Sequence, residues 1–277
     1  MKHPKTCIFC GNRGSISKEH FWPEWLAPHL APAHPNSHVT EFRSAEGKQP
    51  PRLERRSERP GAVNTKKIRV VCATCNTGWM SALESKVKPV FLALLEGSNT
   101  TLSSQGAANV ALWVTVKSIV GEHATESTAL TTPADRLAVL KSQLIPDYFR
   151  IFVALHSLET QTAYYRQSTT VSKTMRGPDP PLPSKIFRNI QATTFLVGPV
   201  CIYVTAARVA GFSGAVLDPV PKMHRLWPDS LPNIELAALR PLAASDVSAI
   251  CRSLDRLVAD PRVKYGGPLP RHEASAT

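Results

Sequence analysis

The chain has 277 residues, of which 43% are hydrophobic and 19% charged, so it is not intrinsically disordered and has the length of one large or two modest domains. Its 33 Lys and Arg outnumber its 21 Asp and Glu by 12, and two thirds of this excess lies in residues 1–95, which suits a polyanion such as DNA or RNA but also a merely solvated basic surface. Because no apolar run reaches the roughly 18 residues that span a bilayer and the N-terminus leads into polar residues, we expect a soluble, cytoplasmic protein with no membrane partner.

The first feature along the chain is a Cys-x-x-Cys pair, and the same spacing occurs a second time further along the chain. Two Cys-x-x-Cys pairs are present, and two further cysteines stand alone in apolar runs: Cys7 and Cys10, Cys72 and Cys75, then Cys201 and Cys251. Each pair places two sulfurs on one side of a tight loop, and two such loops complete the tetrahedron of thiolates that zinc prefers. The sequence therefore predicts a structural Zn²⁺ that holds the fold and takes no part in chemistry. Four unpaired core thiols and redox pairs are the alternatives.

Between the cysteine pairs, residues 27–63 have the composition of an insertion. Six prolines break any long helix, and the block 52–59 is strongly charged. We expect a long, partly mobile segment that contacts a nucleic-acid backbone, or else a solvated loop.

The second pair lies between a short strand and a helix. Residues 66–71 are typical of a strand, and residues 76–95 place Leu83, Val87 and Phe91 at helical spacing on one face. Pro89 predicts a kink or a break within this helix.

The rest of the chain predicts two helices, three strands and a late helix, in the order 107–121, 133–144, 149–155, 163–171, 193–207 and 243–257. The predicted fold is α+β: a small zinc-stapled module over 1–96, then a larger domain over 106–265 with helices and an antiparallel sheet. The role of this domain is not indicated, and neither is an oligomeric state. Residues 266–277 are expected to form a disordered tail.

The residues around the two cysteine pairs follow a known pattern. Glu19 and His20 are followed by Pro23, and residues 75–84 have the sequence Cys-Asn-Thr-Gly-Trp-Met-Ser-Ala-Leu-Glu. This order resembles the HNH endonuclease family, in which a cysteine knuckle, an acidic residue or histidine before a histidine, a proline three residues on and a second knuckle occur in turn. The matching residues are Cys7, Cys10, Glu19, His20, Pro23, Cys72, Cys75 and Asn76. The resemblance covers about a third of the chain and implies a ββα-metal fold.

By this resemblance, the chain is a metal-dependent endonuclease that hydrolyses phosphodiester bonds in DNA, or in RNA. His20 would be the general base that activates a water, since imidazoles titrate near neutral pH. Glu19 and Asn76 would face the catalytic Mg²⁺ or another divalent cation, which would stabilise charge on the scissile phosphate. The residues expected to hold backbone phosphates are Lys66, Lys67 and Arg69.

The sequence departs from the family pattern on the helix. Trp79 and Met80 stand where the family usually has a further histidine or lysine, and Glu84, eight residues past Asn76, is the remaining candidate ligand for the catalytic metal. The nearest counterpart of the family's middle asparagine is Asn64, further from the second knuckle than expected. These departures leave a second prediction open: a catalytically degenerate HNH scaffold that binds nucleic acid without cleaving it. A protein-interaction module built on the zinc fold is a third.

Three structural alternatives apply to single residues. His20 could pack under Trp22 and Trp25. Trp79 and Leu83 are better placed to form a small core between helix and hairpin than to stack on bases. Glu84 could be solvated or could pair with a nearby lysine.

Overall fold

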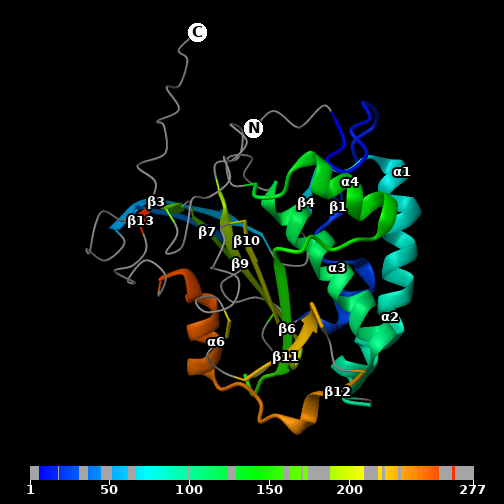
Figure 1. The fold of residues 1–277 in the computed structure, drawn as a ribbon, viewed down its shortest axis with the longest axis vertical. Coiled ribbons are helices and arrows are strands. Elements are labelled where there is room, and N and C mark those ends of the chain that lie inside the picture. The colour runs from blue at the N-terminus through cyan, green and yellow to red at the C-terminus, as the bar shows by residue number, and fades with distance from the viewer. Residues whose placement is uncertain are drawn as a thin grey trace.

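The computed structural model describes residues 6–17, 19–30, 37–44, 52–61, 66–98, 100–123, 129–158, 162–169, 171–173, 188–208, 218–219, 222–229, 232–255 and 264–265. Within these residues, a five-stranded antiparallel sheet has helices on both faces and a small hairpin–helix unit beside it (Figure 1). The expected α+β fold with an antiparallel sheet is therefore confirmed. No helix in the described part of the chain combines the length and apolar character needed to cross a membrane.

The central sheet has the strand order β11-β6-β10-β9-β7. Its strands are β6 (Phe149–Leu155), β7 (Ala163–Thr169), β9 (Ile190–Val197), β10 (Val200–Ala207) and β11 (His224–Trp227). The single strand predicted over 193–207 is wrong, because β9 and β10 form a hairpin in which Val197 pairs with Val200. Gly198, with a φ of 53°, makes the turn in a left-handed conformation that glycine adopts at little cost.

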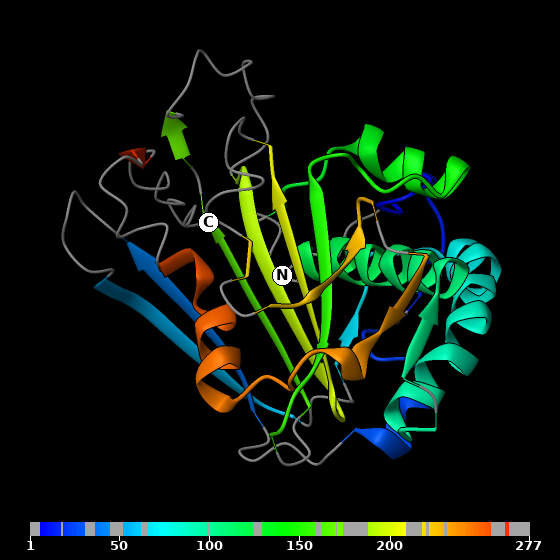
Figure 2. The ribbon, with the colours of Figure 1, turned by 60° about the horizontal axis from the view of Figure 1, so that its bottom comes forward.

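The two faces of the sheet pack against different helices. Successive side chains of a strand point to opposite faces, so Ile151 and Val153 of β6 join the core shared with helix α3 (Ser104–Glu122). Phe152 and Ala154 join a second core on the other face, where helix α6 (Ala244–Cys251) packs. Figure 2 shows the sheet between these two helices.

Helix α3 lies at the centre of the molecule. It begins three residues before the predicted helix, where the Ser103 hydroxyl accepts a hydrogen bond from the N–H of Gly106 at 3.2 Å. It is buried on nearly all sides, between helix α2 and the sheet, as expected for a helix that is apolar around its circumference. Lys117 and Glu122 are nevertheless among its buried residues.

The hairpin–helix unit is built from two short strands and a bent helix. Its elements are β1 (Glu19–His20), β4 (Lys67–Ile68), α1 (Ala73–Cys75), the helical turn Asn76–Met80 and α2 (Ser81–Leu95). Strands β1 and β4 are antiparallel. The break expected at Pro89 is wrong, since α2 is continuous through it, and the backbone instead leaves helical geometry at Gly78.

The remaining elements are short. They are a 3-10 helix (Glu24–His29), β2 (Ser37–Ser44), β3 (Arg52–Pro60), β5 (Thr101–Ser103), α4 (Pro133–Ser142), β8 (Val171–Lys173), β12 (Asn233–Glu235), a 3-10 turn (Leu236–Ala238) and β13 (Lys264–Tyr265). The insertion over 27–63, expected to be a partly mobile segment or a solvated loop, contains the antiparallel hairpin β2–β3, whose register shifts between Phe42 and Arg43. The expected disordered tail, 266–277, lies outside the described residues.

One hydrophobic core joins the hairpin–helix unit to the sheet. Phe21, next to His20, is fully buried, and its ring lies 4.4 Å from that of Tyr164 on β7 and 6.2 Å from that of Phe195 on β9. The same core includes Cys7 and Val204. The division into 1–96 and 106–265 stays a prediction, while the packing is continuous across it.

A partly buried carboxylate caps the start of helix α4. One oxygen of Asp135 accepts hydrogen bonds from the Thr132 N–H, the Thr132 hydroxyl and the Tyr148 hydroxyl, each at 2.7 Å, and pairs with Arg208 at 2.6 Å. Burial raises the pKa of Asp135, but these hydrogen bonds and the Arg208 guanidinium outweigh it, so the net pKa is lowered. The ionised form is therefore favoured by folding.

We expect Asp135→Asn to lower the free energy of unfolding by about 2 kcal/mol at pH 7, because a charged acceptor of several hydrogen bonds is lost. The pKa of the Asp135 carboxyl is lower in the folded protein than in the unfolded chain, where it is about 4. Its contribution to the free energy of unfolding is therefore complete at pH values above the unfolded pKa. It is lost as the pH falls through the folded pKa. Urea unfolding between pH 3 and 7 should show a smaller pH dependence for the variant than for the wild type. The exposed Asp147→Asn is the control, and equal stability of wild type and Asp135→Asn at pH 7 would contradict this.

Candidate functional site

The first cysteine pair lies in a tight turn. The Gly11 N–H donates to the carbonyl of Cys7 at 3.0 Å, and the Cys7 N–H donates to the carbonyl of Asn12 at 3.0 Å. Gly11 has a φ of 72°, which favours glycine at this position. The turn leaves the Cys7 side chain buried and that of Cys10 partly exposed.

The second cysteine pair opens the helix. Cys72 is the N-cap of α1, and its sulfur accepts a hydrogen bond from the Cys75 N–H at 3.5 Å. Backbone hydrogen bonds bring the two pairs together: the Ile8 N–H donates to the Val70 carbonyl at 3.0 Å, and Ile16 forms a β-bridge with Cys72. Residues 56 and 62 positions apart in sequence are thereby joined.

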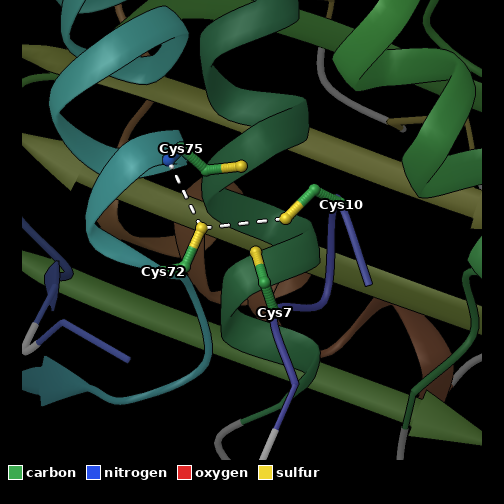
Figure 3. Close-up of side chains that lie close together, drawn as sticks. All are labelled: Cys7, Cys10, Cys72 and Cys75. Atoms are coloured by element: carbon green, nitrogen blue, oxygen red, sulfur yellow. Dashed lines mark hydrogen bonds between the residues drawn. The ribbon is translucent and has the colours of Figure 1, made fainter. Parts of the chain in front are cut away.

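The four cysteines converge on one point, as Figure 3 shows. The sulfurs of Cys7, Cys10, Cys72 and Cys75 all lie within 4.8 Å of one another, and those of Cys10 and Cys72 are 3.7 Å apart. Zn–S bonds of about 2.3 Å in a tetrahedron separate neighbouring sulfurs by about 3.8 Å. The cluster is therefore compatible with a structural metal such as zinc, and it leaves no fifth ligand among the described residues.

The surroundings of the cluster favour a thiolate at Cys7. Burial raises the pKa of the Cys7 thiol, but hydrogen bonds from the backbone N–H groups of Cys10, Cys72 and Phe9 outweigh it and lower the pKa to about 7. The thiolate is the form that binds metal. Burial raises the pKa of the Cys10 and Cys75 thiols, so it is the convergence of the four sulfurs within 4.8 Å, and not the pKa shifts, that is compatible with a closed metal site.

Helix α4 braces the first cysteine turn from outside the hairpin–helix unit. Arg136 donates through Nε to the carbonyl of Ile8 at 2.7 Å, between the two cysteines, and through a terminal nitrogen to the carbonyl of Thr131 at 2.5 Å. Its guanidinium is mostly buried. The sequence pattern gave no indication of this contact, which joins the cysteine cluster to the larger part of the chain.

His20 lies on strand β1 opposite Lys67 of β4. Its side chain is 27% exposed, and Nδ1 lies 3.2 Å from a carboxylate oxygen of Glu24, which is itself 84% exposed. The imidazole is therefore not enclosed beneath Trp22 and Trp25. The Glu24 carboxylate thus lies on the Nδ1 side of the ring.

The other two residues expected at the catalytic metal, Glu19 and Asn76, lie in different elements. Glu19 pairs with Ile68 in the hairpin, and its side chain lies outside the described part of the structure. Asn76 is partly exposed in the first turn after α1, and its N–H donates to the Cys72 carbonyl at 3.0 Å. Helix α1 begins at Ala73, so Asn76 follows the helix start. Glu84 belongs to no cluster of His, Cys, Asp or Glu side chains among those that the structure describes.

Glu84 pairs with a lysine side chain and was expected as a possible ligand of the catalytic metal. Its carboxylate lies 2.9 Å from the ammonium of Lys117, a residue of α3 that is only 2% exposed. The alternative in which Glu84 pairs with a lysine is thus confirmed. The structural alternative for Trp79 and Leu83 is confirmed too: Leu83 is buried, and the Trp79 ring makes an edge contact with Phe9 at 5.1 Å.

The three basic residues before the second cysteine pair do not share one environment. Lys67 is exposed and Arg69 partly exposed. Lys66 instead lies over the rings of Phe21 and Tyr164, at 5.8 and 5.3 Å from their centroids. Burial, with the nearby charge of Arg166, lowers the pKa of Lys66. A phosphate contact by Lys67 and Arg69 stays a prediction, and the position of Lys66 does not support one.

Comparison of the chain with protein-family models, with curated proteins and with solved structures finds no match.

Proposed function

We propose that the chain is an HNH-like endonuclease that hydrolyses phosphodiester bonds in DNA, with zinc in the four-cysteine cluster. The observation that carries the proposal is the position of His20: the cysteine cluster joins a β-hairpin to a helix, and this histidine lies on the hairpin with its imidazole partly exposed and Nδ1 beside a carboxylate. This is the order of elements that the family resemblance implies.

In this proposal, zinc has only a structural role. Four thiolates fill its coordination shell, so no position remains for water or substrate. The metal would hold the turn before β1 and the start of helix α1 at fixed positions. His20, ten residues after Cys10, pairs with Lys67 of β4, five residues before Cys72, so the metal would hold both strands of this hairpin.

His20 would act as the general base. Nε2, the ring nitrogen on the side away from Glu24, would accept a proton from the attacking water. Exposed Lys67, directly across the hairpin, is suitably placed to contact a phosphate oxygen.

The divalent cation that the resemblance implies is not accounted for by the described side chains. Glu84, the acidic residue expected on the helix, is paired with Lys117, and no three described His, Cys, Asp or Glu residues beyond the four cysteines come together. We therefore assign no catalytic step to a cation, and the assay below includes Mg²⁺, Mn²⁺ and Ni²⁺.

Replacing His20 by alanine is expected to lower plasmid nicking at least a hundredfold, because general-base catalysis contributes about 10² to 10⁴. Supercoiled plasmid is incubated with zinc-loaded protein and each divalent cation, and conversion to nicked and linear forms is measured over time. His29→Ala, which removes a histidine in the neighbouring 3-10 helix, is the matched control. Equal nicking by wild type and His20→Ala would contradict the enzymatic proposal.

A second candidate is a zinc protein that binds nucleic acid without cleaving it. The Glu84–Lys117 ion pair favours it, because it removes a candidate metal ligand from the helix. This candidate predicts that the wild type retains DNA on a filter at about 50 mM salt, loses it as the salt concentration rises, and nicks no plasmid with any of the three cations. Absence of retention at low salt would leave the protein-interaction alternative.

A further inference from the structure

Lys117 brings a positive charge to the place where three separate elements meet. It belongs to α3, yet its ammonium lies 2.9 Å from the Glu84 carboxylate of α2 and 3.5 Å from the backbone carbonyl of His20 on β1. Its side chain is 2% exposed, whereas that of Glu84 is 22% exposed. The lysine thus approaches the hairpin–helix unit from its buried side, beneath the proposed base.

The ion pair has a physical consequence for the site. A buried ammonium is costly unless a carboxylate compensates it, and Glu84 supplies that compensation. A divalent cation bound to the same carboxylate would be repelled by the ammonium beside it, since two positive charges about 4 Å apart repel strongly at low dielectric. Glu84 is therefore committed to Lys117.

We infer that Lys117 is a positioning residue of the proposed hydrolytic site. Its ammonium withholds Glu84 from cation binding and, through the His20 carbonyl, holds strand β1 against helices α2 and α3. The claim that Glu84 is withheld from cation binding depends on the ion pair alone. The second part rests on the proposed function, because it gives His20 a catalytic task.

A double-mutant cycle of Glu84→Gln, Lys117→Met and the double variant tests the ion pair by thermal unfolding. Glu84→Gln is expected to lower Tm by about 10 °C, because it removes the carboxylate that lies 2.9 Å from the buried ammonium. Adding Lys117→Met to Glu84→Gln should then raise Tm, since the buried ammonium is removed as well. Lys88→Met, which removes an exposed lysine of α2, is the matched control and should leave Tm within about 2 °C. A double variant that melts below both single variants would overturn the inference.

Binding of Mn²⁺ to zinc-loaded protein, followed by electron paramagnetic resonance, tests whether Glu84 is withheld. Mn²⁺ prefers oxygen ligands and competes poorly for thiolates. The wild type and Glu84→Gln are expected to bind Mn²⁺ equally. A tenfold or greater loss of Mn²⁺ affinity in Glu84→Gln would show that Glu84 is a metal ligand and would overturn the inference.

Cleavage by the double variant tests the positioning role. With Tm and zinc content restored, it should retain DNA like the wild type but nick plasmid at least tenfold more slowly, a change that a purely structural role would not produce. Nicking at the wild-type rate would overturn the positioning role. A wild type that nicks no plasmid would overturn the proposed function and the positioning role with it. The double-mutant cycle by thermal unfolding would still test whether the Glu84–Lys117 ion pair stabilises the protein.

Discussion

Replacing Cys75 by serine is expected to remove the metal from the four-cysteine cluster and to lower Tm by more than about 10 °C. The free energy of binding a structural zinc is free energy of folding, roughly 10 kcal/mol or more in small zinc domains. The loss should spread beyond the N-terminal unit, because Arg136 of α4 donates to the Ile8 carbonyl between Cys7 and Cys10. Zinc content by mass spectrometry and thermal unfolding by circular dichroism, both with and without chelator, measure the effect.

Cys251→Ala is the matched control for this substitution. Cys251 ends helix α6 on the far face of the sheet and belongs to no metal cluster of the described residues. This variant should keep one zinc per chain and respond to chelator as the wild type does. A Cys75→Ser protein with full zinc content and unchanged Tm would contradict the structural role of the cluster.

Replacing Phe21 by alanine is expected to lower the free energy of unfolding by about 4 kcal/mol, in the range found for large aromatic residues in well-packed cores. The ring is fully buried and contacts Tyr164 and Phe195 of the sheet and Trp22 beside it. Because this core joins the hairpin–helix unit to the sheet, the wild type should unfold in one transition, with zinc release and loss of sheet signal coinciding. Urea titration with a zinc-sensitive dye and circular dichroism follows both signals.

Leu144→Ala serves as the comparison, because its side chain is 56% exposed and its loss should cost under about 1 kcal/mol. Separate transitions for zinc release and sheet unfolding in the wild type would show two independent domains, as the predicted boundary near 96–106 implies.

Much of the fold could be predicted because local patterns are strong there. The run 149–155 is apolar except for Arg150 and is observed as β6 with the same bounds. The Cys-x-x-Cys spacing is sufficient to predict the cluster that the structure forms. The hairpin β9–β10 was missed because apolar residues continue through its turn, although Gly198 and Pro199 were the signal for it.

The candidate site was predictable only in part, since it depends on contacts between distant segments. Nothing near Glu84 in sequence indicates that Lys117 is its partner, yet a lone charged residue in the apolar run 107–120 was a signal for a buried ion pair. The same holds for Lys66, whose position over two aromatic rings follows from the packing of Phe21 on Tyr164.

The proposal places one metal ion between the four sulfurs of the cluster, so the coordination of that metal is the central quantity. X-ray absorption at the zinc edge of the purified, zinc-loaded protein measures it directly. We predict four sulfur neighbours at about 2.3 Å and no nitrogen or oxygen in the first shell. A shell that contains nitrogen or oxygen, or fewer than four sulfurs, would contradict the closed four-thiolate centre.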